Sequence, residues 1–100
     1  MPSPYLPLYV GDYLQDTVAL DTTEHGAYLL LLLAAWSNDG EVPADREELY
    51  RLAFAKDASA RKAVDKVVGR YWRPSTTGSG GLMNPRLQRE LVRVDRKSVV

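Results

Sequence analysis

An uninterrupted apolar run from Ala27 to Trp36 constrains the fold of this chain more than any other feature. A run of ten residues is too short for a membrane-spanning helix, which needs about 20. A helix that is apolar on every side has to lie at the centre of a fold. We therefore predict one buried central helix, in which Leu30, Leu33 and Trp36 are mostly buried. No membrane partner is expected, and since residues 1–7 lack the positive charge of a signal peptide, the expected location is the cytoplasm.

Both ends of this helix carry local signals. Asp21 is a good N-cap, and Glu24 follows three residues later, as in a variant of the capping box. Ser37 to Gly40 ends the helix, because Asn and Gly accept the left-handed backbone of a C-terminal cap.

The other expected elements lie on both sides of this helix. Before it comes an extended lead-in over 1–20, and after it come an extended piece at 41–42, a helix from an Asp45 cap to about 53 and a helix over about 58–71 capped by Asp57. A hairpin with strands at 71–73 and 82–83 follows, and then a last helix over 84–97 that Asn84 and Pro85 open.

The predicted helix over about 58–71 has two faces. Its apolar side holds Ala60, Ala63, Val64, Val67, Val68 and Tyr71 at helical spacing. Its opposite side carries the bases Arg61, Lys62, Lys66 and Arg70, with Asp65 and Gly69 among them. A helix with this pattern docks by its apolar side and leaves a mainly cationic face in solvent.

The net charge of zero hides a strong asymmetry along the chain. Residues 1–45 hold seven acids and no base, whereas all thirteen Lys and Arg lie in residues 46–100 with the remaining six acids. Such asymmetry favours an anionic partner for the second half, often nucleic acid. The alternative is a self-complementary domain in which the acidic half faces the basic half.

Residues typical of catalytic or metal sites are few. The chain has no cysteine, which excludes disulfide frameworks, thiolate zinc sites and cysteine nucleophiles. His25 is the single histidine, so a zinc site lacks the nitrogen and sulfur ligands it needs. Asp12, Asp16, Asp21 and Glu24 could hold Mg²⁺ in a nuclease, but caps and turns are the simpler role for them. We expect no enzyme, no cofactor, no metal and no small-molecule substrate.

The order of the predicted elements is that of a mainly α fold with a small β-hairpin, the winged helix-turn-helix. In a helix-turn-helix the second helix enters the major groove. This role falls to the helix over 58–71, with Arg61, Lys62, Lys66 and Arg70 as DNA-binding residues. The hairpin is the expected wing, with an exposed tip at Gly78–Gly81 and DNA contacts from Arg73, Thr76, Thr77 and Ser79. Arg86, Arg89 and Arg93 form a possible secondary basic surface on the last helix.

The N-terminal half carries a set of short motifs over about residues 5–55, with weaker agreement through the last helix. They are Tyr9-Val10-Gly11-Asp12-Tyr13, Asp16-Thr17, Gly26-Ala27-Tyr28, Trp36 and Gly40-Glu41-Val42-Pro43. In these motifs the chain resembles the YdaU-like proteins, a prophage-associated family of unknown function. It departs from them at Tyr13, where the family usually has Trp. That family is similar to the winged-helix N-terminal domains of phage replisome organisers and DnaD-like primosomal proteins, so the resemblance implies a phage replication or regulatory context.

These observations together predict a single winged-helix domain over residues 1–100, with the first domain of a longer protein as the open alternative. The expected function is that of a prophage-encoded protein that binds nucleic acid, with double-stranded DNA as the expected form, in replication initiation or regulation. The alternative is a protein–protein assembly module that does not touch DNA and that forms homo-oligomers or joins replisome proteins.

Overall fold

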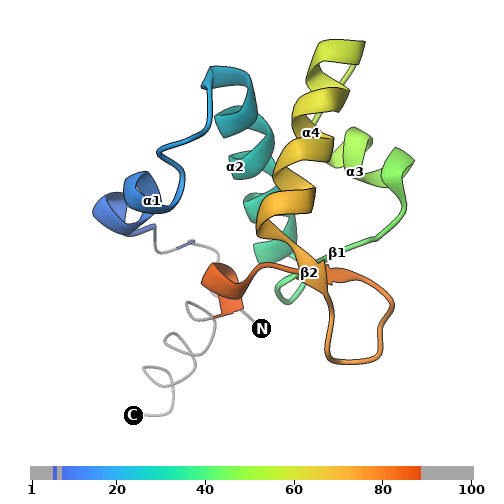
Figure 1. The fold of residues 1–100 in the computed structure, drawn as a ribbon. Coiled ribbons are helices and arrows are strands. Elements are labelled where there is room, and N and C mark those ends of the chain that lie inside the picture. Colours follow the sequence, from blue (N-terminus) through green and yellow to red (C-terminus); the bar gives the residue numbers. More distant parts are fainter. Residues whose placement is uncertain (1–5, 7, 89–100) are drawn as a thin grey trace.

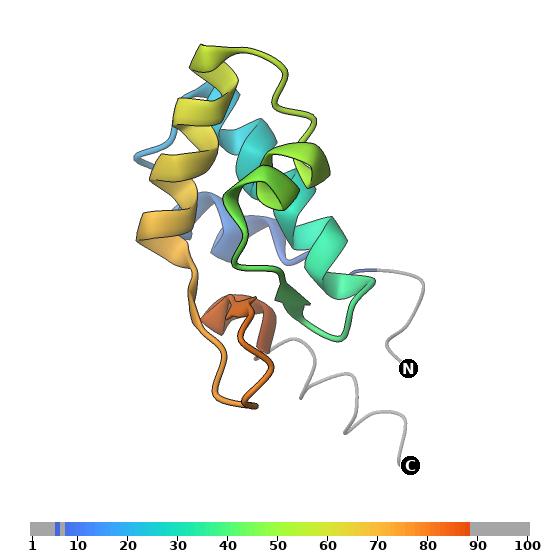
Figure 2. The ribbon, with the colours of Figure 1, turned by 90° about the vertical axis from the view of Figure 1, so that its right-hand side faces the viewer.

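The computed structural model describes residue 6 and residues 8–88, and it is mainly helical with one small sheet (Figure 1). The elements are, in order, α1 (Val10–Asp16), α2 (Thr22–Trp36), β1 (Glu41–Val42), α3 (Arg46–Leu52), α4 (Ala58–Tyr71), β2 (Arg73–Pro74) and β3 (Leu82–Met83). A further helical turn follows at 85–88. The sheet is antiparallel with the strand order β1-β3-β2, so the extended piece at 41–42 pairs with the hairpin as expected (Figure 2).

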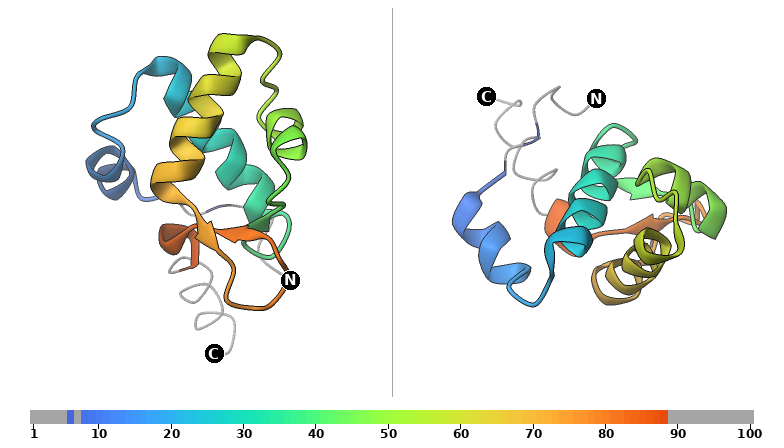
Figure 3. Two further views of the ribbon diagram at one scale, coloured as in Figure 1. Left: turned by 45° about the vertical axis from the view of Figure 1, so that its right-hand side comes forward. Right: turned by 90° about the horizontal axis from the view of Figure 1, so that it is seen from above.

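Helix α2 is the centre of the fold. Seen from above, it lies between α1 on one side and the pair α3 and α4 on the other (Figure 3). Tyr28, Leu31 and Leu32 are all 1% exposed or less, and Trp36 is also buried. In the described part of the chain, no helix has both the length and the apolar character needed to cross a membrane.

The prediction that Leu33 is buried is wrong, since this side chain is 45% exposed. At 100° per residue, Leu33 and Gly26 stand on the side of α2 opposite the row of Tyr28, Leu31 and Ala35. The neighbouring elements are too few to cover that side. A helix that is apolar on every side can therefore still expose one of its sides to solvent.

The predicted caps are confirmed. The Asp21 carboxylate accepts from the Glu24 amide at 2.8 Å, and the Glu24 carboxylate accepts from the Asp21 amide at 2.9 Å, which completes the capping box. Asp45 caps α3 by accepting from the Glu48 amide, and Asp57 caps α4 by accepting from the Ala60 amide, without the reciprocal bond of α2. Each cap satisfies an amide that the helix itself leaves without a partner.

The extended lead-in predicted over 1–20 is wrong from Val10 to Asp16, where the chain forms α1. The prolines that favour extended backbone end at Pro7, so nothing in the local sequence bars a helix after them. No residue of α1 is fully buried, and tertiary contacts hold the helix in place. The hydroxyl of half-buried Tyr13 lies 2.9 Å from Nδ1 of His25 at the start of α2.

Candidate nucleic-acid interface

Helix α4 presents the most strongly basic face among the described residues. Ala63, Val64, Val67 and Val68 are buried against the core, as the sequence pattern predicted. The four bases of the opposite face, Arg61, Lys62, Lys66 and Arg70, are all exposed. The apolar side therefore fixes the helix and leaves the cationic side open.

The four bases have different surroundings. Lys66 pairs with Glu24 of α2 at 3.0 Å, so its charge is largely neutralised. Arg61 lies over the ring of Tyr50 at 5.7 Å, and Arg70 lies over the ring of Tyr71 at 5.4 Å. Among the described residues, no carboxylate forms an ion pair with Arg61, Lys62 or Arg70. These three bases are the ones available to an anionic partner.

Two acids border this face. Asp65 accepts from the Tyr50 hydroxyl at 2.8 Å and pairs with Arg46 of α3 at 3.4 Å. Hydrogen bonds from the Asp21 amide and from Lys66 hold the pKa of Glu24 below its ordinary value. Both carboxylates are engaged by neighbouring side chains, and they divide the basic face into separate positions.

The polar residues of the expected wing contact a carboxylate of β1. Oε2 of Glu41 accepts from Ser75 at 2.7 Å and from Thr77 at 2.9 Å, and Oε1 accepts from Ser79. These three bonds lower the pKa of Glu41, Ser79 having the largest effect. The hydroxyls of Thr77 and Ser79, which we expected to contact DNA, are therefore used inside the protein.

The other two residues of the expected wing also make internal contacts. Thr76 Oγ1 lies 3.9 Å from the sulfur of Met83. Arg73 donates from one Nη to the carbonyls of Arg70, at 3.2 Å, and Trp72, at 3.0 Å. No described carboxylate pairs with the Arg73 guanidinium, so it extends the basic row of α4 beyond the end of the helix.

Arg86 does not lie on an exposed basic surface of the last helix, and this part of the prediction is wrong. The residue is 6% exposed, its guanidinium pairs with Asp16 at 3.1 Å, and it also donates to the carbonyl of Tyr9 at 3.3 Å. The short helical turn at 85–88 packs against α1, and Arg86 forms that contact. Arg89 and Arg93 lie outside the described residues.

An aromatic cluster lies beside Arg86 and was not found from the sequence. The Tyr28 ring contacts Tyr13 and Tyr71 edge to face, at centroid distances of 5.9 and 4.9 Å. The Arg86 guanidinium lies 5.9 Å from the centroid of Tyr13. Tyr9 and Tyr13 stand four residues apart in the sequence, a spacing typical of side chains that pack on one side of a helix. The spacing does not indicate which residues of α4 and of the 85–88 turn they pack against.

Three of the four carboxylates considered for a Mg²⁺ site have other roles. Asp21 and Glu24 form the capping box, and Asp16 pairs with Arg86. Within the described ranges, no group of three His, Asp or Glu side chains is arranged to hold a metal ion.

Comparison with known proteins gives two matches to uncharacterised proteins. The model of a family described as "Protein of unknown function (DUF1376)" matches residues 4–92. The uncharacterized protein YdaU of Escherichia coli (strain K12) is 49% identical over 43 residues, which are 43% of this chain and 15% of YdaU. No solved structure matches the chain at a significant level. Because the family match covers most of the chain, the protein belongs to this YdaU-like family of unknown function.

Proposed function

We propose that this chain is a winged helix-turn-helix domain that binds duplex DNA through α4. The order and pairing of the elements support the assignment, since a turn joins α3 to α4 and the hairpin of β2 and β3 lies beside β1. The second helix of such a unit lies in the major groove. This role belongs to α4, whose core side is fixed and whose outer side is basic.

The observation that carries the proposal is the set of exposed bases on α4 without carboxylate partners among the described residues: Arg61, Lys62 and Arg70. Phosphate contacts supply most of the affinity, and Arg61 and Lys62, one turn into the helix, are placed to reach base edges. The expected similarity of the YdaU-like family to phage replisome organisers is the ground for proposing a prophage origin and a cytoplasmic role in phage replication or its regulation.

The test is a salt titration of duplex binding, followed by fluorescence anisotropy. Replacing Arg61 and Lys62 together with Ala removes two exposed charges, so the slope of log K against log salt falls by roughly 1.8 if both meet phosphates. Ala is a strong helix former, so the fold is retained. Lys66 is left in place, because its removal leaves the nearly buried Glu24 without its cation.

Arg51→Ala is the matched control. Arg51 is an exposed base on α3 that already pairs with Glu48, so its loss leaves the slope unchanged. Equal affinities and equal slopes for the parent and the Arg61/Lys62 variant contradict the proposal, whereas a lower affinity with an unchanged slope assigns base contacts to these two residues. A duplex and a single strand of the same length, compared at one salt concentration, separate the two forms of DNA.

A protein–protein assembly role is the second candidate, and one observation favours it. Val10, Leu14 and Val18 are 66%, 56% and 84% exposed, and the first two stand one turn apart on α1. Exposed apolar side chains that lie together are typical of protein contact sites. Sedimentation of the parent and of Val10→Ser/Leu14→Ser over a range of protein concentrations tests this role, since only an assembly surface makes the mass concentration-dependent.

A further inference from the structure

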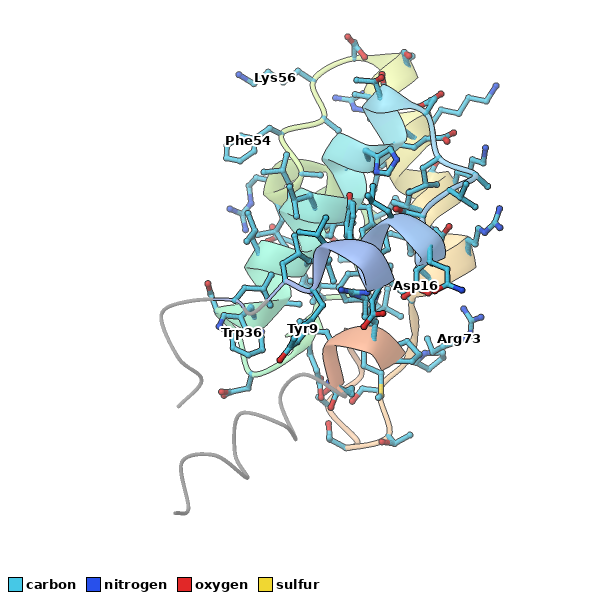
Figure 4. The ribbon with its side chains drawn as sticks, turned by 90° about the vertical axis from the view of Figure 1, so that its left-hand side faces the viewer. Tyr9, Asp16, Trp36, Phe54, Lys56 and Arg73 are labelled. Atoms are coloured by element: carbon cyan, nitrogen blue, oxygen red, sulfur yellow. The ribbon has the colours of Figure 1, made fainter. Side chains whose placement is uncertain are left out.

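A small hollow opens where the end of α4, β2 and the 84–86 segment meet the last turn of α1, and it has a volume of about 240 Å³. Three arginines line it, Arg70, Arg73 and Arg86, against the single carboxylate of Asp16. Figure 4 shows Asp16 and Arg73 on the same edge of the molecule. The lining therefore carries an excess of positive charge.

Not every hollow in the described part of the chain carries free positive charge. One lined by Arg51 and Lys56 also has two bases, but Arg51 pairs with Glu48. A larger one, of about 690 Å³, lies between the start of α2 and α4. There Lys62 and Lys66 face three acids, Asp21, Glu24 and Asp65, so the lining is net acidic. An anion is favoured in the smaller hollow and disfavoured in the larger one.

The three guanidiniums are already held in place. Arg86 is fixed by Asp16 and the Tyr9 carbonyl, Arg73 by two carbonyls at the end of α4, and Arg70 by the Tyr71 ring. A guanidinium presents five donors in a planar fork that matches phosphate oxygens. Side chains that are ordered before binding lose less conformational entropy when the ligand arrives.

We propose that this hollow binds one phosphate group, and that the group is a phosphodiester of the duplex bound by α4. The identity of the source rests on the proposed function, whereas the binding of phosphate does not. Arg70 and Arg73 supply the excess charge and contact the phosphate oxygens, while Arg86, whose charge Asp16 balances, lines the hollow beside them. The hollow thus continues the basic row of α4 toward the base of the wing.

The first experiment uses inorganic phosphate alone, without DNA. Phosphate is titrated into the ¹⁵N-labelled protein, with sodium chloride of equal ionic strength as the reference. We expect saturable shifts confined to the backbone amides of Arg70, Tyr71, Arg73 and Arg86, and a roughly five- to tenfold weaker affinity in Arg73→Ala. Lys56→Ala is the control, because Lys56 is an exposed base far from Arg73 (Figure 4).

The proposal is overturned if phosphate and chloride cause the same amide shifts. It is also overturned if Arg73→Ala and Lys56→Ala lower the affinity for phosphate equally. Unaltered dispersion of the other amides in Arg73→Ala shows that the variant is folded. Arg73→Lys, which keeps the charge without the fork, separates charge from geometry: it is expected to recover only part of the affinity.

The second experiment identifies the source of the phosphate group with duplex DNA. If a phosphodiester occupies the hollow, Arg73→Ala lowers the salt slope by about 0.9 and leaves the effect of Arg61 and Lys62 unchanged. Phosphate binding in a protein that does not bind DNA supports the site, assigns it to free phosphate and overturns the proposed function alone. The opposite result has two parts: DNA binding depends on Lys62 but not on Arg73, and added phosphate causes no saturable amide shifts. This result overturns the site and leaves the proposed function standing.

Discussion

Ser75 Oγ donates a hydrogen bond of 2.7 Å to Oε2 of Glu41, although 34 positions separate the two residues in the chain. Thr77 and Ser79 donate to the same carboxylate. One side chain of β1 therefore orders three hydroxyls in the hairpin loop. The loop at 75–81 has the Gly, Ser and Thr composition of a flexible segment, but these hydrogen bonds connect it to the sheet.

Glu41→Gln is expected to reduce the sensitivity of the fold to acid. The folded-state pKa of Glu41 lies below its ordinary value of 4.5, so its contribution to stability is complete above that value and is lost as the pH falls through the lowered pKa. The Gln variant lacks this contribution at every pH. Urea unfolding at about pH 7 and about pH 3 then shows a smaller difference in free energy for the variant than for the parent.

Glu47→Gln is the control for this experiment, since Glu47 is an exposed carboxylate of α3. Glu24 keeps its own acid-sensitive contribution in both variants. If Glu41→Gln and Glu47→Gln depend on pH in the same way, the three hydroxyls do not stabilise the ionised Glu41.

Trp36→Ala is expected to destabilise the protein by about 3–5 kcal/mol, because the ring is 4% exposed and its loss leaves a cavity. Leu33→Ala on the same helix is expected to change stability by no more than about 0.5 kcal/mol, because Leu33 is 45% exposed. Thermal unfolding of the two variants measures the difference. Similar losses in both would show that α2 has no solvent side.

Phe54→Gly is expected to stabilise the protein. Phe54 has φ 55° at the end of α3, where its amide bonds to Arg51 O and the Ala55 amide bonds to Tyr50 O. This is the Schellman arrangement, in which the left-handed residue is usually Gly. A left-handed backbone costs a bulky residue about 1–2 kcal/mol, and Phe54 is 68% exposed, so little burial is lost.

The measurement is the free energy of unfolding in urea, with Phe54→Ala as the control that keeps a Cβ and hence the strain. Gly is expected to exceed Ala in stability. A lower stability for Gly than for Ala would mean that this turn carries no strain.

Two glycine substitutions are expected to have opposite effects. A Cβ at Gly69 of α4 meets no atom within 4 Å, so Gly69→Ala is expected to stabilise by about 0.5–1 kcal/mol. A Cβ at Gly81 would lie 2.8 Å from the carbonyl oxygen of Val42, so Gly81→Ala is expected to destabilise by about 1–3 kcal/mol. Differential scanning calorimetry gives the sign of the change in unfolding temperature for each variant. An equal change in the two variants would contradict the close approach of Gly81 to β1.

Local sequence patterns determined much of the secondary structure. The Asp residues that cap α2, α3 and α4 each bond an amide three positions later, so the signal and its partner lie in the same short segment. The two faces of α4 follow directly from its apolar spacing. The strands at 41–42 and 82–83 were marked by their flanking turn residues, and they pair as the predicted element order required.

Only the tertiary structure decided which polar groups meet. Arg86 is buried because Asp16, 70 positions earlier, supplies its counter-charge, and no local pattern distinguishes it from a surface arginine. The hydroxyls of the hairpin loop bond to Glu41 because β1 lies beside β3. Leu33 is exposed because the described elements leave one side of α2 uncovered. The spacing of apolar residues indicates which side of a helix favours burial. The number and placement of the neighbouring helices and strands decide which side chains are covered.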